Sequence, residues 1–326
     1  MKKSFIPFDK KILYGVVAAV CFVFFAGADD GKLYGVPPPF ILATGGKPAD
    51  TSAVTAQPMN AEPTISGIEK DAPKLYGAAA QGGLLWGMTG DDVAVYDVGA
   101  NRKISADGLF VVGLGRDAGS PLKLEFRKKG AEAKVFSYEI KQRKYVEQSI
   151  TVPQKAIVYS DDVKKRIKAE SAALSVARTN AESDSARYFM NLVFPENLRG
   201  IRISTEFGMR RTYNHGAKET LHNAVDIAAP AGTDVHPVGS GVVIYAHDMY
   251  ESGNTVVISH GHNVTSTYCH MQKLNVKAGD RVAPGDVIGW VGSTGASTTG
   301  AHLHLQMGDG FTRIDPLLVL NVNAKW

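Results

Sequence analysis

All nine histidines of the chain lie between His215 and His304, and the first 214 residues contain none. Four of them fall in three short motifs: His222-x-x-x-Asp226, Tyr268-Cys269-His270 and His302-Leu303-His304. Histidine is the commonest neutral nitrogen ligand of catalytic zinc and the commonest general acid or base near neutral pH. The clustering therefore predicts that the chemistry of this chain is confined to one domain and is assisted by a metal ion.

The spacing inside these motifs allows the side chains of each pair to face one groove. In a strand, residues two or four apart point to the same face, which fits His302 with His304 and His222 with Asp226. A spacing of four would also align a pair on a helix. However, residues 225–230 predict a strand that runs into a turn.

His270 stands at the end of a further predicted strand, two residues after Tyr268. The alternation of a strand places Cys269 on the opposite face, as a small buried residue and not as a ligand or nucleophile. A hydrolytic zinc site needs three protein ligands, one open position for water, and further groups that handle the proton and the oxyanion. Two histidines and an aspartate, with two spare histidines, meet that requirement.

Four segments together resemble a known family, the lysostaphin/LytM-type zinc metallopeptidases, which cut peptide cross-links in bacterial peptidoglycan. They are Phe207-Gly208-Met209-Arg210-Arg211, His222-Asn223-Ala224-Val225-Asp226-Ile227-Ala228, Tyr268-Cys269-His270 and His302-Leu303-His304-Leu305. The similarity runs from about Ile201 to Pro316 and includes a Gly-rich stretch at residues 292–300. Separate motifs in the family's order make the resemblance specific.

The resemblance implies a role for each motif residue. His222, Asp226 and His304 would be the ligands of one Zn²⁺ ion. His270 and His302 would line its open side as catalytic residues that activate water or hold the oxyanion, and the sequence leaves open which does which. Spacing alone does not choose between His302 and His304 as the ligand.

The chain departs from the family pattern in the surroundings of the motifs. Ala224 stands where the family usually has Gly, and Ala301 replaces a usual Pro. The Gly-rich loop is one residue longer, with paired Thr298 and Thr299. These changes put the shape of the groove in question and remove no ligand.

The remaining histidines belong to no complete motif. They are His215, His236, His247, His260 and His262, and we expect them at the surface, in turns or at the groove rim. Asp280 and Asp286 stand in Gly-Asp turn contexts and are expected to be structural.

The first residues predict export. Lys2, Lys3, Lys10 and Lys11 precede an uncharged run from Ile12 to Ala28 that ends in small residues, the pattern of a secretory signal. We expect cleavage after Ala28 and a periplasmic or cell-envelope protein, with an uncleaved membrane anchor at residues 1–28 as the alternative. Any membrane contact would be made through that segment only.

Four further regions follow the signal. Residues 29–80 are rich in Pro, Gly, Ala and Thr and predict a flexible linker. Residues 81–155 alternate short strands with turns and predict a small antiparallel immunoglobulin-like β-sandwich. Residues 160–180 predict a helical linker capped by Ser160. Residues 187–326 predict an antiparallel β-sheet metallopeptidase domain, so the fold class is mainly β.

The net charge limits which partners the chain can bind, and the cysteine content limits which disulfides it can form. The formal net charge is +4, and residues 1–28, with four lysines and one aspartate, contribute +3 of it. The exported part is thus nearly neutral, which does not favour nucleic-acid binding. Cys269 would be the only cysteine left after cleavage, so no intrachain disulfide is expected. Peptidoglycan is the expected partner, with other envelope proteins as candidates.

Two other functions compete with a zinc endopeptidase as interpretations of the sequence. Residues 276–289 resemble the hairpins of biotinyl and lipoyl carrier domains, but no lysine stands at a suitable hairpin tip. A non-enzymatic scaffold or activator of other wall hydrolases is the main alternative, and it predicts missing ligands, whereas every motif residue is present. The D-alanyl–diaminopimelate cross-link is the expected scissile bond, and a pentaglycine bridge is the second candidate.

Overall fold

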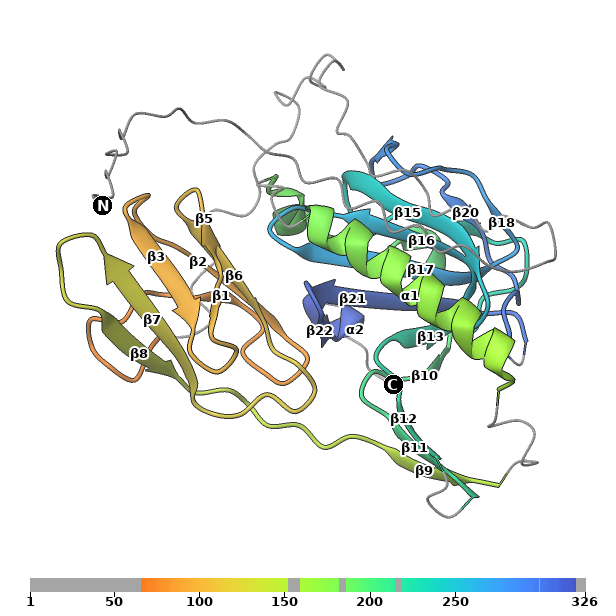
Figure 1. Ribbon diagram of the computed structural model, residues 1–326, viewed down its shortest axis with the longest axis horizontal. Coiled ribbons are helices and arrows are strands. Elements are labelled where there is room, and N and C mark those ends of the chain that lie inside the picture. Colours follow the sequence, from red (N-terminus) through yellow and green to blue (C-terminus); the bar gives the residue numbers. More distant parts are fainter. Residues whose placement is uncertain (1–65, 152–158, 182–185, 215–217, 299, 321–326) are drawn as a thin grey trace, which may run out of the picture. The chain divides into compact units, whose positions relative to one another are not determined.

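The computed structural model describes residues 66–151, 159–181, 186–214, 218–298 and 300–320 (Figure 1). All of them belong to one compact unit, Pro38–Trp326. The predicted signal at residues 1–28 and most of the predicted linker lie outside the described residues. Within the described residues, no helix has the length and apolar character needed to cross a membrane. The fold is mainly β with antiparallel sheets, as predicted.

The first part of the described chain is a pair of four-stranded antiparallel sheets. One sheet has the order β1 (Tyr76–Gly77), β2 (Leu84–Met88), β6 (Leu109–Gly113) and β5 (Ser105–Ala106). The other has the order β4 (Arg102–Lys103), β3 (Val93–Asp97), β7 (Leu122–Lys128) and β8 (Lys134–Tyr138). Their shared core contains Leu85, Val95, Phe110, Leu124 and Tyr138. The sandwich is confirmed, whereas its immunoglobulin-like identity stays a prediction.

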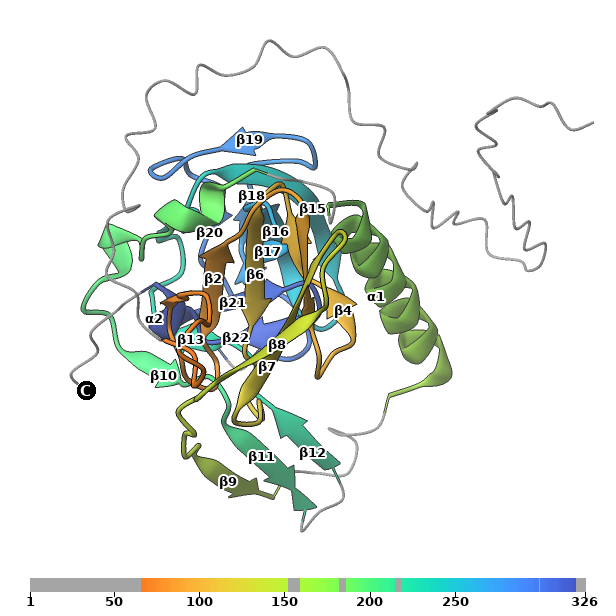
Figure 2. The same ribbon diagram turned by 90° about the vertical axis from the view of Figure 1, so that its left-hand side faces the viewer.

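The predicted boundaries of this sandwich need correction at both ends. Leu75 is fully buried and β1 pairs with β2, so the sandwich begins before residue 81 and takes in the end of the predicted linker. At the other end, β9 (Glu147–Ile150) pairs in parallel with β11 (Arg210–Tyr213), not with a strand of the sandwich. β11 pairs in turn with β12 (Lys218–Leu221), forming a three-stranded sheet (Figure 2).

The C-terminal part is built on an eight-stranded sheet. Its order is β10 (Ile203–Thr205), β13 (Val225–Ile227), β21 (Leu303–Asp309), β17 (Val264–Met271), β16 (Gly253–Ser259), β15 (Gly241–Met249) and β19 (Arg281–Val282), with β22 (Thr312–Ile314) paired to β21. A small sheet of β14 (Asp234–Val235), β20 (Gly289–Trp290) and β18 (Lys273–Leu274) adjoins it. The strands are rich in Val, Ile, Thr and Tyr, which favour a pleated, half-buried surface.

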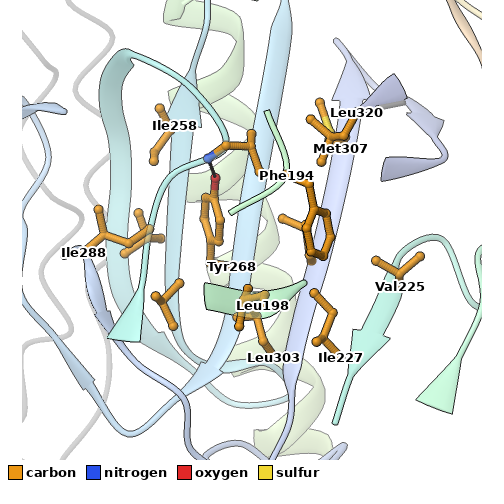
Figure 3. Close-up of a cluster of buried hydrophobic side chains, with 14 of the residues drawn as sticks. Phe194, Leu198, Val225, Ile227, Ile258, Tyr268, Ile288, Leu303, Met307 and Leu320 are labelled. Atoms are coloured by element: carbon orange, nitrogen blue, oxygen red, sulfur yellow. Dashed lines mark hydrogen bonds between the residues drawn. The ribbon is translucent and has the colours of Figure 1, made fainter. Parts of the chain in front are cut away.

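A large apolar cluster packs on this sheet (Figure 3). Tyr268 of β17 is fully buried there, with Phe194, Leu198 and Leu303 in the same cluster. Its hydroxyl accepts a hydrogen bond of 2.8 Å from the backbone N–H of Val238, so the buried oxygen is satisfied. This core fixes the strand that carries the Tyr268-Cys269-His270 motif.

The predicted helix is present as α1 (Asp161–Ala181). The Ser160 hydroxyl accepts from the backbone N–H of Val163 at 3.4 Å, as expected for an N-cap. The helix lies along β15 of the C-terminal sheet (Figure 1). Near its end, the buried Arg178 donates to the hydroxyl of Thr267 at 3.4 Å. The predicted spacer helix is thus packed on the sheet.

Three short helical turns in the C-terminal part were not predicted. They are η3 (Tyr188–Asn191), η4 (Glu196–Leu198) and α2 (Pro316–Val319). For α2 the sequence did hold a signal, because Asp315 caps the backbone N–H of Leu317 and Pro316 occupies the first turn. The two turns of 3₁₀ helix have no side-chain cap and carried no such signal.

Candidate metal centre

The register of the sheet brings two of the predicted ligands together. Asp226 of β13 lies directly opposite His304 of β21, and Cys269 of β17 lies opposite His304 on the other side. Residues opposite each other in an antiparallel pair project to the same face. Asp226 Oδ1 is therefore only 2.9 Å from His304 Nδ1.

His222 reaches the same point from outside the strands. β12 ends at Leu221 and β13 begins at Val225, so His222 lies in a turn and not on the single strand that its spacing from Asp226 suggested. The loop at residues 206–209 fixes it. The backbone N–H of His222 donates to Met209 O (2.8 Å), its carbonyl accepts from Gly208 N–H (2.7 Å), and its ring Nδ1 is 3.1 Å from Glu206 O.

These contacts leave three ligand atoms facing one another. One atom from each of His222, Asp226 and His304 lies within 4.8 Å of the other two. The carbonyl of Glu206 can only accept, so Nδ1 of His222 carries a proton and Nε2 is the ring atom that faces the site. Nε2 lies 3.0 Å from Asp226 Oδ1. Two imidazole nitrogens and a carboxylate oxygen that converge in this way fit a divalent metal.

The electrostatics of the site favour an ionised Asp226 carboxylate. Burial alone would raise the pKa of Asp226, but hydrogen bonds to His222 and His304 outweigh it and hold the pKa well below its ordinary value. Burial lowers the pKa of His304, with Asp226 opposing the shift. A negative oxygen with two nitrogen donors is a set that suits zinc.

His270 and His302 stand beside these three residues. The ring of His270 is 4.9 Å from that of His302 and 5.7 Å from that of His304, measured between centroids. His302 Nε2 is 3.7 Å from Asp226 Oδ1. The Nδ1 atoms are hydrogen-bonded to backbone carbonyls, of Thr294 for His270 (2.8 Å) and of Gly300 for His302 (2.9 Å).

Because those carbonyls can only accept, Nδ1 carries the proton in both rings and Nε2 is the basic nitrogen. Burial lowers the pKa of His270 to about 4, so its ring is neutral at neutral pH. Both side chains can therefore accept a proton or a hydrogen bond at Nε2. The geometry does not separate their roles.

A turn between β15 and β16 holds His270 in place. The residue has φ +61°, in the left-handed region, and its backbone N–H donates to Ser252 O at 2.8 Å. The Gly-rich loop is pinned to the same turn, because the backbone N–H groups of Ala296 and Ser297 donate to Tyr250 O and Glu251 O. The carbonyl of Thr294 that orients the His270 ring is therefore itself fixed.

All five predicted site residues thus meet in one place, whereas the other histidines have separate surroundings. His236 and His247 are partly or fully exposed, as expected, and His215 lies outside the described residues. His260 is buried outside any turn, so the expectation of a surface, turn or rim position is wrong for it, whereas His262 is buried but lies in the turn before β17, as expected. Asp280 and Asp286 accept backbone N–H groups in turns, which confirms their structural role.

His260 is part of a buried polar network. Its Nδ1 donates to Ser240 O (2.7 Å), and its Nε2 is 2.8 Å from the Ser266 hydroxyl, which is bonded in turn to the Tyr268 hydroxyl. Burial lowers the pKa of His260 to about 4. The network connects the tyrosine of the Tyr268-Cys269-His270 motif to the neighbouring strand.

The residues that differ from the family pattern lie close to the site and displace none of the proposed ligands. Ala224 is fully buried beside the turn that carries His222. Ala301 is exposed, and Thr298 Oγ1 lies 3.5 Å from His302 Nδ1. Cys269 is buried, as predicted, and burial raises the pKa of its thiol to about 11. Its position opposite His304 places it on the face of Asp226 and His304, so the expectation that it points away from the site is wrong.

Residues 220–316 match the family model described as Peptidase family M23. The chain is 41% identical over 106 residues to the peptidoglycan DD-endopeptidase ShyA of Vibrio cholerae, which is 32% of this chain and 24% of that protein. It is 41% identical over 96 residues to the glycyl-glycine endopeptidase ALE-1 of Staphylococcus capitis, 29% of this chain and 26% of that protein. The chain thus spans about a quarter of the length of each relative.

A solved structure resembles a larger part of the chain. It is the crystal structure of a putative peptidase M23 from Pseudomonas aeruginosa, with a TM-score of 0.53 and 25% identity. The match covers 74% of this chain and 95% of that one. The similarity therefore extends beyond the segment that matches the family model.

Proposed function

Because residues 220–316 form a peptidase M23 domain, we propose that this chain is an exported zinc-dependent endopeptidase that hydrolyses peptide cross-links of bacterial peptidoglycan. One observation carries the proposal. One potential ligand atom from each of His222, Asp226 and His304 lies within 4.8 Å of the other two, with Nε2 of His222 3.0 Å from the Asp226 carboxylate.

The five site residues divide by their contacts. His222, Asp226 and His304 would hold one Zn²⁺ ion, whose Lewis acidity would activate water and polarise the scissile carbonyl. His270 and His302 present a basic Nε2 beside the ligands, since backbone carbonyls occupy their Nδ1 protons. One would take a proton from the attacking water and the other would stabilise the oxyanion.

Peptidoglycan is the proposed substrate because the named relatives are cell-wall endopeptidases. Within it, we propose the D-alanyl–diaminopimelate bond, as for a DD-endopeptidase such as ShyA. A pentaglycine bridge is the second candidate, since ALE-1 is a glycyl-glycine endopeptidase with the same identity to this chain. The signal-like residues 1–28 support action in the periplasm or cell envelope.

The alternative of a non-enzymatic scaffold or activator of wall hydrolases has one requirement that the chain does not meet. A protein that only binds needs none of these five hydrolase side chains, three of which (His222, His270 and His302) are oriented by backbone carbonyls. All five are present and converge. The enzyme is therefore the function that the site supports best.

The test combines metal analysis with digestion. The purified full chain and its Asp226→Ala variant would be assayed for zinc by mass spectrometry, then incubated with diaminopimelate-type and pentaglycine-type peptidoglycan. We expect one zinc ion per wild-type chain and new uncross-linked muropeptides from the diaminopimelate type. Wild-type protein without zinc, or without products from either substrate, would refute the enzyme; products from the pentaglycine type alone would refute the proposed bond.

A further inference from the structure

Tyr145 lies between β8 and β9, outside every motif, and packs on the loop that holds His222. Its ring is 6.2 Å from the ring of Phe207, between centroids, in an edge-on arrangement. It also lies flat against Gly208, where an added Cβ would come within 2.2 Å of Tyr145 Cδ1. Gly208 has φ +82°, a conformation that strongly favours glycine. The loop at residues 206–209 is thus shaped around this ring.

Two arginines also contact the ring of Tyr145. Arg116, from the loop between β6 and β7, places its guanidinium carbon 4.6 Å from the ring centroid of Tyr145 and donates from Nε to Gly208 O at 2.7 Å. Arg143 lies 5.2 Å from the same centroid and forms an ion pair with the buried Asp315. Cation–π contacts of this kind gain strength when water is excluded.

The same loop makes every backbone contact that fixes His222. Gly208 N–H donates to its carbonyl, Met209 O accepts its N–H, and Glu206 O pairs with its ring Nδ1. Carbonyl groups in that last position set the tautomer and orientation of a metal-binding histidine. Arg116 and Tyr145 therefore act on His222 through one intervening loop.

We infer that Tyr145 and Arg116 are positioning residues for His222, so that the upstream part of the chain sets the affinity of the site for its metal. This rests on the proposed role of His222 as a zinc ligand. Neither residue touches the ligand atoms, and neither is in a segment that resembles the family motifs. The contribution comes from the residues before β9, which lie outside the 220–316 match.

The test is the affinity for Zn²⁺ of the full chain, measured by competition with a chelator. Tyr145→Ala and Arg116→Gln should weaken zinc binding roughly 10-fold or more, as for other residues that orient metal ligands. Tyr145→Phe should bind zinc as the wild type does, because the Tyr145 hydroxyl has no hydrogen-bond partner among the described residues. Tyr96→Ala is the matched control, since it removes a second Arg–Tyr stack, with Arg127 at 4.0 Å, inside the sandwich.

A second measurement does not depend on zinc. In metal-free protein, the amide hydrogens of Gly208 and His222 should exchange faster in Tyr145→Ala than in the wild type, and not in Tyr96→Ala. Unchanged zinc affinity and unchanged exchange in folded Tyr145→Ala, or equal losses in Tyr96→Ala, would overturn the inference. If Tyr145→Ala does not fold, zinc affinity and amide exchange of Arg116→Gln decide between these outcomes. If the wild type binds no zinc, but the amides of Gly208 and His222 still exchange faster in Tyr145→Ala than in the wild type, the proposed function is refuted. The role of Tyr145 in positioning His222 would then stand.

Discussion

Asp226 and His304 lie directly opposite each other on β13 and β21, with Oδ1 2.9 Å from Nδ1. The distance is set by the register of two buried strands and not by a flexible loop. A slip of one residue in either strand would turn one of the side chains to the other face. Two of the three proposed ligands therefore lie on paired strands of the sheet, and His222 completes the set from the connection between β12 and β13.

Replacing any one ligand should remove metal and activity together. We expect His222→Ala, Asp226→Ala and His304→Ala to lose bound zinc, because each removes one of the three proposed ligands. Zinc at 1,000 times its Kd should stabilise the wild type by about 4 kcal/mol and leave these variants unchanged. Metal content and thermal unfolding with and without zinc measure both effects. His247→Ala, at an exposed position, is the control.

Replacing either of the two remaining histidines should separate metal binding from activity. His270→Ala and His302→Ala remove a basic Nε2 beside the site but no ligand atom, so we expect zinc content to stay at the wild-type level. The rate of muropeptide release should fall about 10²- to 10⁴-fold, the usual range for loss of an acid–base group. If either variant also lost its zinc, the division between ligands and catalytic residues would be wrong.

Glu170 of α1 should support the turn that holds His270. Its Oε2 accepts from the backbone N–H of Tyr250 at 2.9 Å, two residues before the carbonyl of Ser252 that binds His270 N–H. Glu170→Ala should cost about 1 kcal/mol of stability and lower kcat with zinc content unchanged.

Two variants of α1 control for that effect. Glu170→Gln keeps an acceptor oxygen and should restore most of the activity. Asp161→Asn breaks an exposed pair with Lys164 on the same helix and should have no measurable effect. Urea unfolding and steady-state kinetics of the three variants are the measurements. Equal losses in Glu170→Ala and Asp161→Asn would mean that the helix has no specific link to the site.

His260 should make the stability of the fold depend on pH. Burial lowers its pKa to about 4 in the folded chain, whereas an unfolded histidine titrates near 6.5. Between these values the unfolded chain binds more protons. The stability that depends on a neutral His260 is therefore complete above pH 6.5. As the pH falls from 6.5 to 4, this part of the free energy of unfolding, roughly 3 kcal/mol, is lost.

The measurement is urea unfolding of metal-free protein at pH 7.5, 6 and 5, for the wild type and for His260→Asn. Metal-free protein is used so that protonation of the zinc ligands does not add to the slope through loss of metal. The wild type should lose stability more steeply with falling pH than the variant. Parallel pH profiles would show that His260 is not the titrating group.

Residue types, their spacing and the family resemblance indicated the candidate chemistry of this chain. Histidine is confined to residues 215–304, and the motifs and the resemblance selected His222, Asp226, His270, His302 and His304 there. The helix at residues 161–181 and the main strands were also predicted, because capping and apolar periodicity act locally.

Tertiary structure decided what holds those residues in place. Glu206, Gly208, Ser252 and Thr294 act through backbone N–H or carbonyl groups, which every residue carries and no composition marks. The pairing of β9 with β11, the burial of His260 and the contact of Tyr145 with Gly208 join segments far apart in the chain. Local sequence specifies which groups can do chemistry, but only long-range packing specifies their distances.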